Sequence, residues 1–144
     1  MPCGIGLHPY FHCTAETRID AGVERSWSID EDRLPAESVP ARGHYDLRDR
    51  RLCGTDLDNG FAGWSGEATI RDPSWPFAVR LSATNAPFLH LWTPVDENFF
   101  GAEPVSHADA ALSEPEERWP ELGIRVLETG EVMSLAMSIE LLAP

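Results

Sequence analysis

The chain of 144 residues has no lysine and no glutamine, and its eleven strongly basic residues are all arginine. Against these stand 24 acidic residues, which gives a formal net charge of −13. Nucleic-acid phosphates and anionic membrane surfaces both attract basic patches, so a chain this acidic is expected to bind neither. The charge balance therefore predicts no nucleic-acid partner and no membrane partner.

The sequence also lacks the segments that direct a chain into or across a membrane. It contains no run of about 18 apolar residues and no basic segment followed by an apolar stretch. Its three cysteines, Cys3, Cys13 and Cys53, are odd in number and show no CxxC spacing. That pattern predicts free thiols in a reducing compartment rather than disulfides or a zinc site, and hence a cytoplasmic protein.

A helical period is missing as well, because no window of a dozen residues keeps apolar side chains on one helical face. Twelve prolines and eleven glycines instead divide the chain into short segments. The pattern predicts an all-β fold, an antiparallel β-sandwich, over a single domain of residues 1–144. Strands are expected at residues 25–30, 66–72, 77–84, 88–94, 99–105 and 133–141, with mostly loop at 30–51 and one helical turn at 113–120.

The C-terminal strand has the clearest pattern. Apolar residues at odd positions from Met133 to Leu141 alternate with smaller or polar ones, which is typical of a half-buried strand. The preceding segment 123–132 carries a Thr129-Gly130 turn signal, so the two segments are expected to form a hairpin.

Two titratable residues lie in apolar surroundings. His8 lies in GIGLHPYF, where it is either a packed core histidine or a catalytic group that needs a partner. Its HxxxH spacing to His12 does not predict a metal site, because Pro9 disfavours a helix. Glu103 lies in NFFGAEPVSHADAAL, where partial desolvation would raise its pKa toward the range of a general base.

Further candidates have simpler explanations beside the functional ones. Asp58 in TDLDNGF could bind a ligand, or it could belong to an Asp-Asn-Gly turn. Trp64, Trp75 and Trp92 could stack on a sugar ring, or they could be core residues of a sandwich.

Four segments in order resemble the aldose 1-epimerase (galactose mutarotase) family: GIGLHPYF, LDNGFAGWSGEATI, NFFGAEPVSHADA and ELGIRVLETGEVMSLAMSIEL. The resemblance implies a galactose-mutarotase-like supersandwich of which this chain forms part. It implies His8 as the acid, Glu103 as the base, and Asp58 as a contact to a hexose. Among the tryptophans, Trp64 is the one expected to bind the substrate together with Asp58. It implies no metal and no cofactor, because the reaction only transfers protons.

The resemblance covers the C-terminal half of the family. The N-terminal half supplies a second histidine and an arginine, and the segments with His44, His90 and His107 do not match it. The chain is therefore expected to form a homo-oligomer or to pair with the missing N-terminal half, since a half-sheet has open edges.

The alternatives are a sugar-binding protein without turnover, an inactive remnant of such an epimerase, and a two-carboxylate glycosidase using Asp58 and Glu103. An epimerase is expected to hold His8 and Glu103 in one cleft, about 5 to 6 Å apart.

Overall fold

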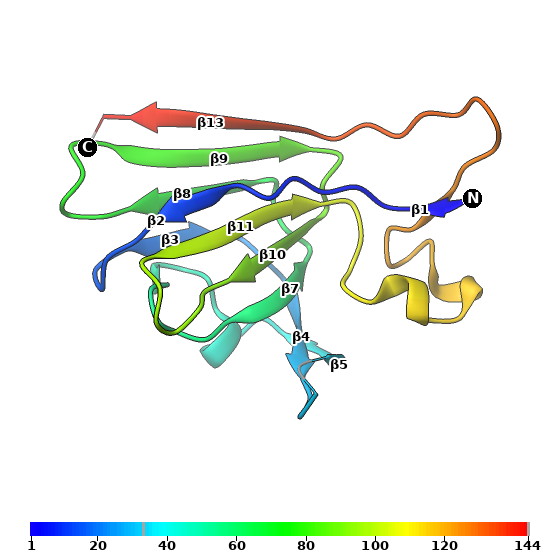
Figure 1. The fold of residues 1–144 in the computed structure, drawn as a ribbon, viewed down its shortest axis with the longest axis horizontal. Coiled ribbons are helices and arrows are strands. Elements are labelled where there is room, and N and C mark those ends of the chain that lie inside the picture. The colour runs from blue at the N-terminus through cyan, green and yellow to red at the C-terminus, as the bar shows by residue number, and fades with distance from the viewer. Residues whose placement is uncertain (33, 144) are drawn as a thin grey trace.

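The computed structural model describes residues 1–32 and 34–143, and two antiparallel sheets dominate them (Figure 1). The six-stranded sheet has the order β2-β11-β10-β7-β4-β5, and the five-stranded sheet has the order β13-β9-β8-β3-β6. The six-stranded sheet comprises β2 (Tyr10–His12), β4 (Arg25–Ile29), β5 (Pro35–Pro40), β7 (Asp58–Ala62), β10 (Phe88–Trp92) and β11 (Phe99–Val105). The five-stranded sheet comprises β3 (Arg18–Ala21), β6 (Arg50–Arg51), β8 (Glu67–Arg71), β9 (Ala78–Thr84) and β13 (Ala136–Leu142).

The remaining elements are short. Strand β1 (Pro2–Cys3) pairs with β12 (Arg125–Val126) apart from the two large sheets. The 3-10 helices are η1 (Gly43–Tyr45), η2 (Ala111–Ser113) and η3 (Glu116–Arg118). No helix among residues 1–32 and 34–143 is both long and apolar enough to cross a bilayer.

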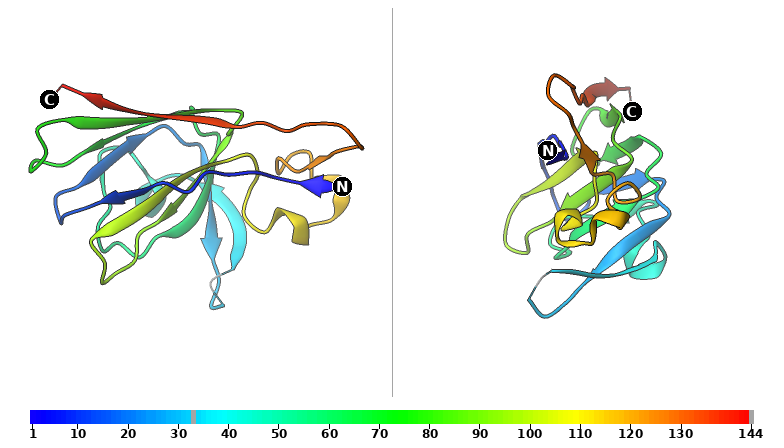
Figure 2. Two further views of the ribbon diagram at one scale, coloured as in Figure 1. Left: turned by 45° about the horizontal axis from the view of Figure 1, so that its top comes forward. Right: turned by 90° about the vertical axis from the view of Figure 1, so that its right-hand side faces the viewer.

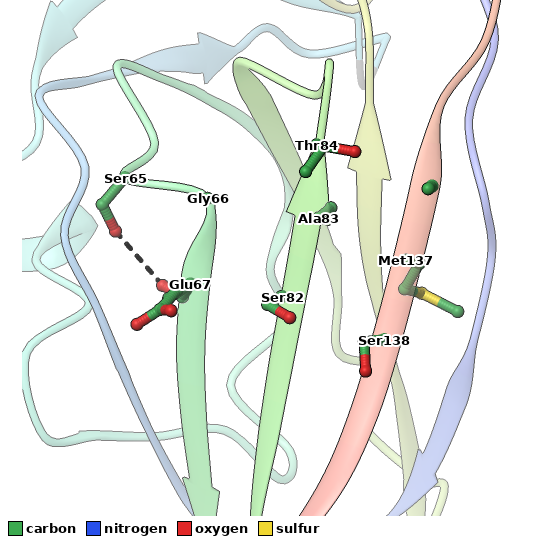
Figure 3. A pocket seen from close by; sticks show the side chains of 9 residues that line it. Ser65, Gly66, Glu67, Ser82, Ala83, Thr84, Met137 and Ser138 are labelled. Carbon is green, nitrogen blue, oxygen red and sulfur yellow. Dashed lines mark hydrogen bonds between the residues drawn. The ribbon is translucent and has the colours of Figure 1, made fainter.

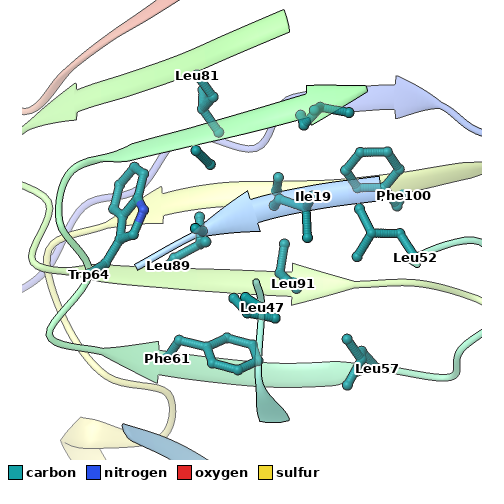
Figure 4. Close-up of a cluster of buried hydrophobic side chains, with 14 of the residues drawn as sticks. Ile19, Leu47, Leu52, Leu57, Phe61, Trp64, Leu81, Leu89, Leu91 and Phe100 are labelled. Carbon is teal, nitrogen blue, oxygen red and sulfur yellow. The ribbon is translucent and has the colours of Figure 1, made fainter. Parts of the chain in front are cut away.

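The core lies between the two sheets and follows from the alternation of side chains along each strand. In β10, Leu89 and Leu91 are fully buried, whereas the neighbouring His90 and Trp92 are only partly buried. The large side chains of this core are Ile19, Leu47, Leu52, Leu57, Phe61, Trp64, Leu81, Leu89, Leu91 and Phe100 (Figure 4). Burying one large apolar side chain stabilises the fold by about 1.5–3 kcal/mol, so this layer fixes which face of each strand points outward.

A second, smaller core covers part of the outer face of the six-stranded sheet. Phe88 of β10 packs with Leu122 and Ile124, and Trp27 of β4 packs against the same cluster. The segment around η2 and η3 supplies this cover at one end of the sandwich (Figures 1 and 2). The polar side chains of β7, β10 and β11 lie on the remainder of that face.

The expected all-β, antiparallel sandwich is confirmed, as are five of its strands. The segments 25–30, 66–72, 77–84, 88–94 and 99–105 correspond to β4, β8, β9, β10 and β11. The expected C-terminal strand is present but begins only at Ala136. Its apolar face is more open than expected, because Ile139 and Leu141 are 47% and 65% exposed.

The expected hairpin between 123–132 and the C-terminal strand is wrong. Strand β13 pairs with β9, while β12 pairs with β1 near the N-terminus. The Met1 ammonium donates to the Leu127 carbonyl and the Leu127 amide donates to the Met1 carbonyl, which extends that second pairing. The local turn signal did not determine the pairing here. The backbone hydrogen-bonding groups of the two segments are paired instead with β1 and β9, which are distant in sequence.

Two further findings concern the expected loop 30–51 and the Asp-Asn-Gly sequence, for which a turn was one of two open alternatives. The expected loop 30–51 contains β5, an edge strand that pairs only with β4 and carries Pro35 and Pro40 at its ends, where proline is tolerated. The Asp58-Asn59-Gly60 sequence is not a turn but the start of β7, a central strand. Asn59 is buried there, and its side-chain amide donates to the Trp27 carbonyl at 2.7 Å.

Candidate acid–base site

Three neighbouring strands direct polar side chains to the outer face of the six-stranded sheet. Because Phe61, Leu91 and Ala102 point into the core, the residues of opposite parity on β7, β10 and β11 point outward. His90 lies directly opposite Glu103 on β11 and Gly60 on β7, and Asp58 lies opposite Trp92. The sheet register therefore brings Asp58, His90 and Glu103 together.

His8 joins this group from the segment that precedes β2. That segment runs beside β11, where the Leu7 amide donates to the Pro104 carbonyl at 3.0 Å and the Ala102 amide donates to the Pro9 carbonyl at 3.3 Å. The His8 Nε2 lies 3.0 Å from the Glu103 Oε1. The His8 side chain is 49% exposed, which excludes the interpretation of His8 as a packed core histidine.

The direct contact corrects the expected spacing of the pair. The two groups face each other as predicted, but 3.0 Å replaces the separation of about 5 to 6 Å expected for a cleft that admits a sugar edge. A carboxylate and an imidazole attract each other, so the half-exposed ring closes onto the glutamate.

Glycine 101 provides the room for this contact. A Cβ atom on Gly101 would lie 2.9 Å from the Glu103 Oε1 and 3.4 Å from the His8 Cε1. Real Cβ atoms do not approach another atom as closely as 2.9 Å. The absence of a side chain at this position therefore lets the acid and the base lie over the strand.

Glu103 combines burial with nearby charges of both signs. Its side chain is only 13% exposed. Desolvation raises the pKa of Glu103 above its ordinary value, while the neighbouring His90 and His8 act in the opposite direction. A carboxyl group with a raised pKa is suited to accept and return a proton near neutral pH.

Two residues of the cluster were missed by sequence reasoning. His90 received no role because its segment matched no family motif, and Asp109 was passed over within the SHADA sequence. The Asp109 Oδ2 lies 2.7 Å from the His90 Nδ1, and the Asp58 Oδ1 lies 3.1 Å from the His90 Nε2. The Phe-Leu-His-Leu-Trp alternation was the available signal, since it places His90 opposite to the core-facing leucines.

The aromatic residues around His8 differ partly from those expected. Tyr10 lies 4.6 Å from the His8 ring between ring centroids and contacts Trp92 and Phe99. Trp92 therefore lies beside the site, as one of the possible sugar-stacking tryptophans. Trp64 does not, because it is 6% exposed in the core and its indole N–H donates to the Glu67 carbonyl. With no exposed ring face, Trp64 cannot stack on a sugar, and the core interpretation of Trp64 is the correct one.

A cavity of about 350 Å³ adjoins Asp58 and is lined by Ile29, Asp30, His44, Tyr45, Asp56 and Asn59. Its volume lies within the range of about 300–1,000 Å³ typical of small-molecule sites. A different hollow of about 420 Å³ lies on the five-stranded sheet, where Ser65, Glu67, Ser82, Thr84 and Ser138 line it (Figure 3). No histidine is among the residues that line this second hollow.

The cluster is not arranged as a metal centre. Across residues 1–32 and 34–143, no three or more His, Cys, Asp or Glu side chains converge in a way that could hold a metal ion. Both nitrogens of His90 are occupied by carboxylates, and His8 faces Glu103. The chemistry available to these side chains is proton transfer and hydrogen bonding.

A sequence model of aldose 1-epimerase matches residues 1–140. The chain belongs to the aldose 1-epimerase family. The match extends over almost the whole chain.

The chain is also similar to a curated protein and to solved structures. The uncharacterized Escherichia coli protein YphB is 33% identical over 127 residues, covering 81% of this chain and 43% of YphB. A crystal structure of a putative aldose 1-epimerase from E. coli K12 has a TM-score of 0.87 at 30% identity, over 100% of this chain and 52% of that one. A galactose mutarotase-like protein from Clostridium acetobutylicum shares the fold, with a TM-score of 0.78 at 16% identity over 100% of this chain and 48% of its own. The chain thus spans about half the length of these relatives.

Proposed function

We propose that this chain carries the acid–base pair of an aldose 1-epimerase, which interconverts the α and β anomers of a free hexose. The observation that carries the proposal is the 3.0 Å contact between the His8 Nε2 and the Glu103 Oε1. Membership of the aldose 1-epimerase family supports it. So does the raised pKa of Glu103, which desolvation produces.

The proposed reaction moves two protons and then returns them. The Glu103 carboxylate accepts the proton of the C1 hydroxyl, and the protonated His8 donates a proton to the ring oxygen, so the C1–O5 bond breaks. The aldehyde rotates about C1–C2 and closes on its other face. On closure, the Glu103 carboxyl protonates the carbonyl oxygen and His8 recovers its proton from the former ring oxygen. The cycle uses no cofactor.

Asp58 is proposed to accept hydrogen bonds from sugar hydroxyls. Its side chain is 39% exposed, and it borders the cavity of about 350 Å³. The exposed Tyr10 and the neighbouring Trp92 offer apolar ring surface beside His8. A sugar entering here would separate His8 from Glu103 and take over their hydrogen bonds.

A second candidate is hexose binding without turnover, as in an inactive remnant. It is favoured by the direct 3.0 Å contact between the His8 Nε2 and the Glu103 Oε1, which leaves no gap between the two groups for the C1–O5 edge of a sugar. We propose that the chain corresponds to the C-terminal half of the family and acts as a homo-oligomer or beside an N-terminal half. Light scattering during size-exclusion chromatography tests self-association, since a monomer mass of 16.0 kDa is known. The cytoplasmic location stays a prediction.

Polarimetry of freshly dissolved α-D-galactose and α-D-glucose tests the catalytic proposal. The purified chain should accelerate the relaxation of rotation beyond the rate in buffer. Glu103→Gln should remove that acceleration, because the amide cannot accept the proton. Glu67→Gln is the matched control, since Glu67 is an exposed glutamate of the five-stranded sheet.

If the wild type relaxes no faster than buffer, catalysis by this chain alone is refuted. Saturation-transfer NMR with the same sugars then separates binding without turnover from no binding at all. Loss of activity in the Glu67→Gln variant as well would instead contradict the assignment of Glu103 as the base.

A further inference from the structure

His90 is held by a carboxylate at each ring nitrogen. The Asp109 Oδ2 lies 2.7 Å from Nδ1 and the Asp58 Oδ1 lies 3.1 Å from Nε2. An ionised carboxylate only accepts hydrogen bonds, whereas a neutral imidazole has one donor nitrogen and one acceptor. Both contacts are satisfied together only when both nitrogens carry hydrogen, so the geometry selects the imidazolium cation.

The backbone fixes this arrangement from three sides. Asp58 comes from β7, His90 from β10, and Asp109 from the segment between β11 and η2. Asp109 reaches His90 by lying over Gly60, where a Cβ atom would be 2.7 Å from the Asp109 Oδ2. The His90 side chain is 17% exposed, so water contributes little to its solvation. Two charged hydrogen bonds therefore replace the water that the ring has lost.

Glu103 is the third carboxylate around His90. It lies directly across the β10–β11 pair, at the position where cross-strand side chains are about 4.5–5.5 Å apart at Cβ. His8 contacts Glu103 from the segment before β2. The charged groups that face His90 are thus Asp58, Asp109 and Glu103, and His8 lies beyond Glu103.

The two histidines consequently differ in what they can do. Burial opposes the charge on His90, but the hydrogen bonds that its ring donates to Asp109 and Asp58 outweigh it and raise the pKa of His90 to about 10. His90 keeps its proton throughout the neutral range. His8, half exposed and in contact with one carboxylate, is the ring that can exchange a proton with a ligand.

We propose that His90 is a positioning residue whose fixed positive charge keeps Glu103 ionised as a base and holds Asp58 in place for the sugar. This inference rests on the proposed epimerase function. Its electrostatic part concerns only Glu103, His90 and their neighbours, so it can be measured without turnover. An opposite charge at this range lowers the pKa of a carboxyl group by about 1 to 3 units.

NMR of the full chain tests the charge directly. With ¹⁵N-labelled histidine, both His90 ring nitrogens should remain in the N–H form from about pH 6 to about pH 8. With ¹³C-labelled glutamate, the Glu103 carboxyl should titrate about one pH unit higher in His90→Gln than in the wild type. His12→Gln, the same change at an exposed histidine of β2, should leave the Glu103 titration unchanged.

Polarimetry adds a catalytic readout. In His90→Gln the acidic limb of the pH–rate profile should move up by about one unit, with roughly tenfold lower activity on that limb and little change at high pH. Should His90→Gln fail to fold, Asp109→Asn keeps the ring and removes one carboxylate, and His90 should then lose its proton at a lower pH.

The inference is overturned if Glu103 titrates at the same pH with and without His90. It is equally overturned if a His90 ring nitrogen loses its hydrogen between about pH 6 and about pH 8, or if Asp109→Asn leaves the His90 titration unmoved. An inactive wild type refutes the epimerase function, whereas the two NMR titrations still decide the role of His90.

Discussion

Asp72 is a buried carboxyl group and Glu103 a largely buried one, yet their surroundings shift the carboxyl pKa in opposite directions. Asp72 is 5% exposed and accepts hydrogen bonds from the hydroxyls of Thr14 and Thr17 and from the amide and hydroxyl of Ser74. Glu103 has the ring of His8 as its hydrogen-bonding neighbour and lies beside Gly101, which offers no side chain.

The pKa directions follow from this difference. Desolvation acts to raise the pKa of Asp72, but the hydrogen bonds from Ser74, Thr14 and Thr17 outweigh it and hold that pKa well below the ordinary value. For Glu103 desolvation dominates and the pKa is raised. A carboxylate surrounded by donors stabilises the fold, whereas one that lacks them remains available for proton transfer.

The largest effect that tests this contrast is expected for Glu103→Gln. Mutarotation should fall by about 10²–10⁴-fold, the usual contribution of a general acid or base. The free energy of unfolding should stay the same or rise, because a carboxylate that is costly to desolvate is removed. Polarimetry and urea unfolding of the same samples measure both. A large loss of stability would show that Glu103 supports the fold as Asp72 does.

Asp72→Asn should show the converse. An amide nitrogen cannot accept the Thr14 and Thr17 hydroxyl bonds, and we expect the free energy of unfolding to fall by about 2 kcal/mol. Urea unfolding measures this loss, with Asp20→Asn as a control at an exposed position of β3. Equal free energies of unfolding for Asp72→Asn and Asp20→Asn would refute the structural role of Asp72. Activity per folded molecule should remain close to that of the wild type.

Gly101→Ala should weaken catalysis without weakening the fold. The added methyl would stand 2.9 Å from the Glu103 Oε1, so the carboxylate must move away from its present position. We expect roughly tenfold lower activity, in line with the sensitivity of catalysis to small misplacements. Gly22→Ala is the matched control, because its nearest neighbour, the Ser65 Oγ, is 3.5 Å away. Equal activities of the two variants would contradict the placement of the base over β11.

The smallest effect concerns acid. Because the folded-state pKa of Asp72 is lowered, its contribution to stability is present above the unfolded-state value of about 3.9 and declines as the pH falls further. The stability difference between the wild type and Asp72→Asn should therefore be constant near neutral pH and shrink below about pH 4. Urea unfolding at several pH values measures it. A difference that grows on acidification would reverse the assigned direction of the Asp72 pKa.

Strands with local signals could be predicted from the sequence, and pairings between distant segments could not. The turn signals around residues 77–84 and 99–105 identified β9 and β11, since short apolar segments between turn residues can be recognised from neighbouring residues alone. The partners of β12 and β13 depend on which strands distant in sequence have an unpaired edge. A local sequence pattern carries no information about that. The Asp-Asn-Gly sequence does not form a turn but starts β7. The side-chain amide of Asn59 donates there to the Trp27 carbonyl of another strand.

The residues of the site likewise divide into those predicted from local motifs and those that depend on contacts between distant segments. His8 and Glu103 were predicted because each lies in a motif that resembles the family, and the structure brings their side chains into contact. His90 and Asp109 were not predicted as site residues. Their positions in the cluster depend on the register between β7, β10 and β11 and on the segment that places Asp109 over Gly60. Trp64 was expected to contact the sugar but lies in the core. The sequence does not distinguish a tryptophan ring that faces the core from one that faces a ligand.

The attachment of the N-terminal segment to β11 has a consequence for folding. The proposed acid and base are separated by 95 positions (103 − 8 = 95), and the bonds of Leu7 and Pro9 to β11 hold His8 beside Glu103. Adjacent strands such as β8 and β9 can pair much earlier, since contacts between distant segments slow folding. In a refolding reaction, the return of catalysis should therefore lag behind the return of the β-sheet circular dichroism signal. Enzyme activity would then report when the N-terminal segment attaches to β11.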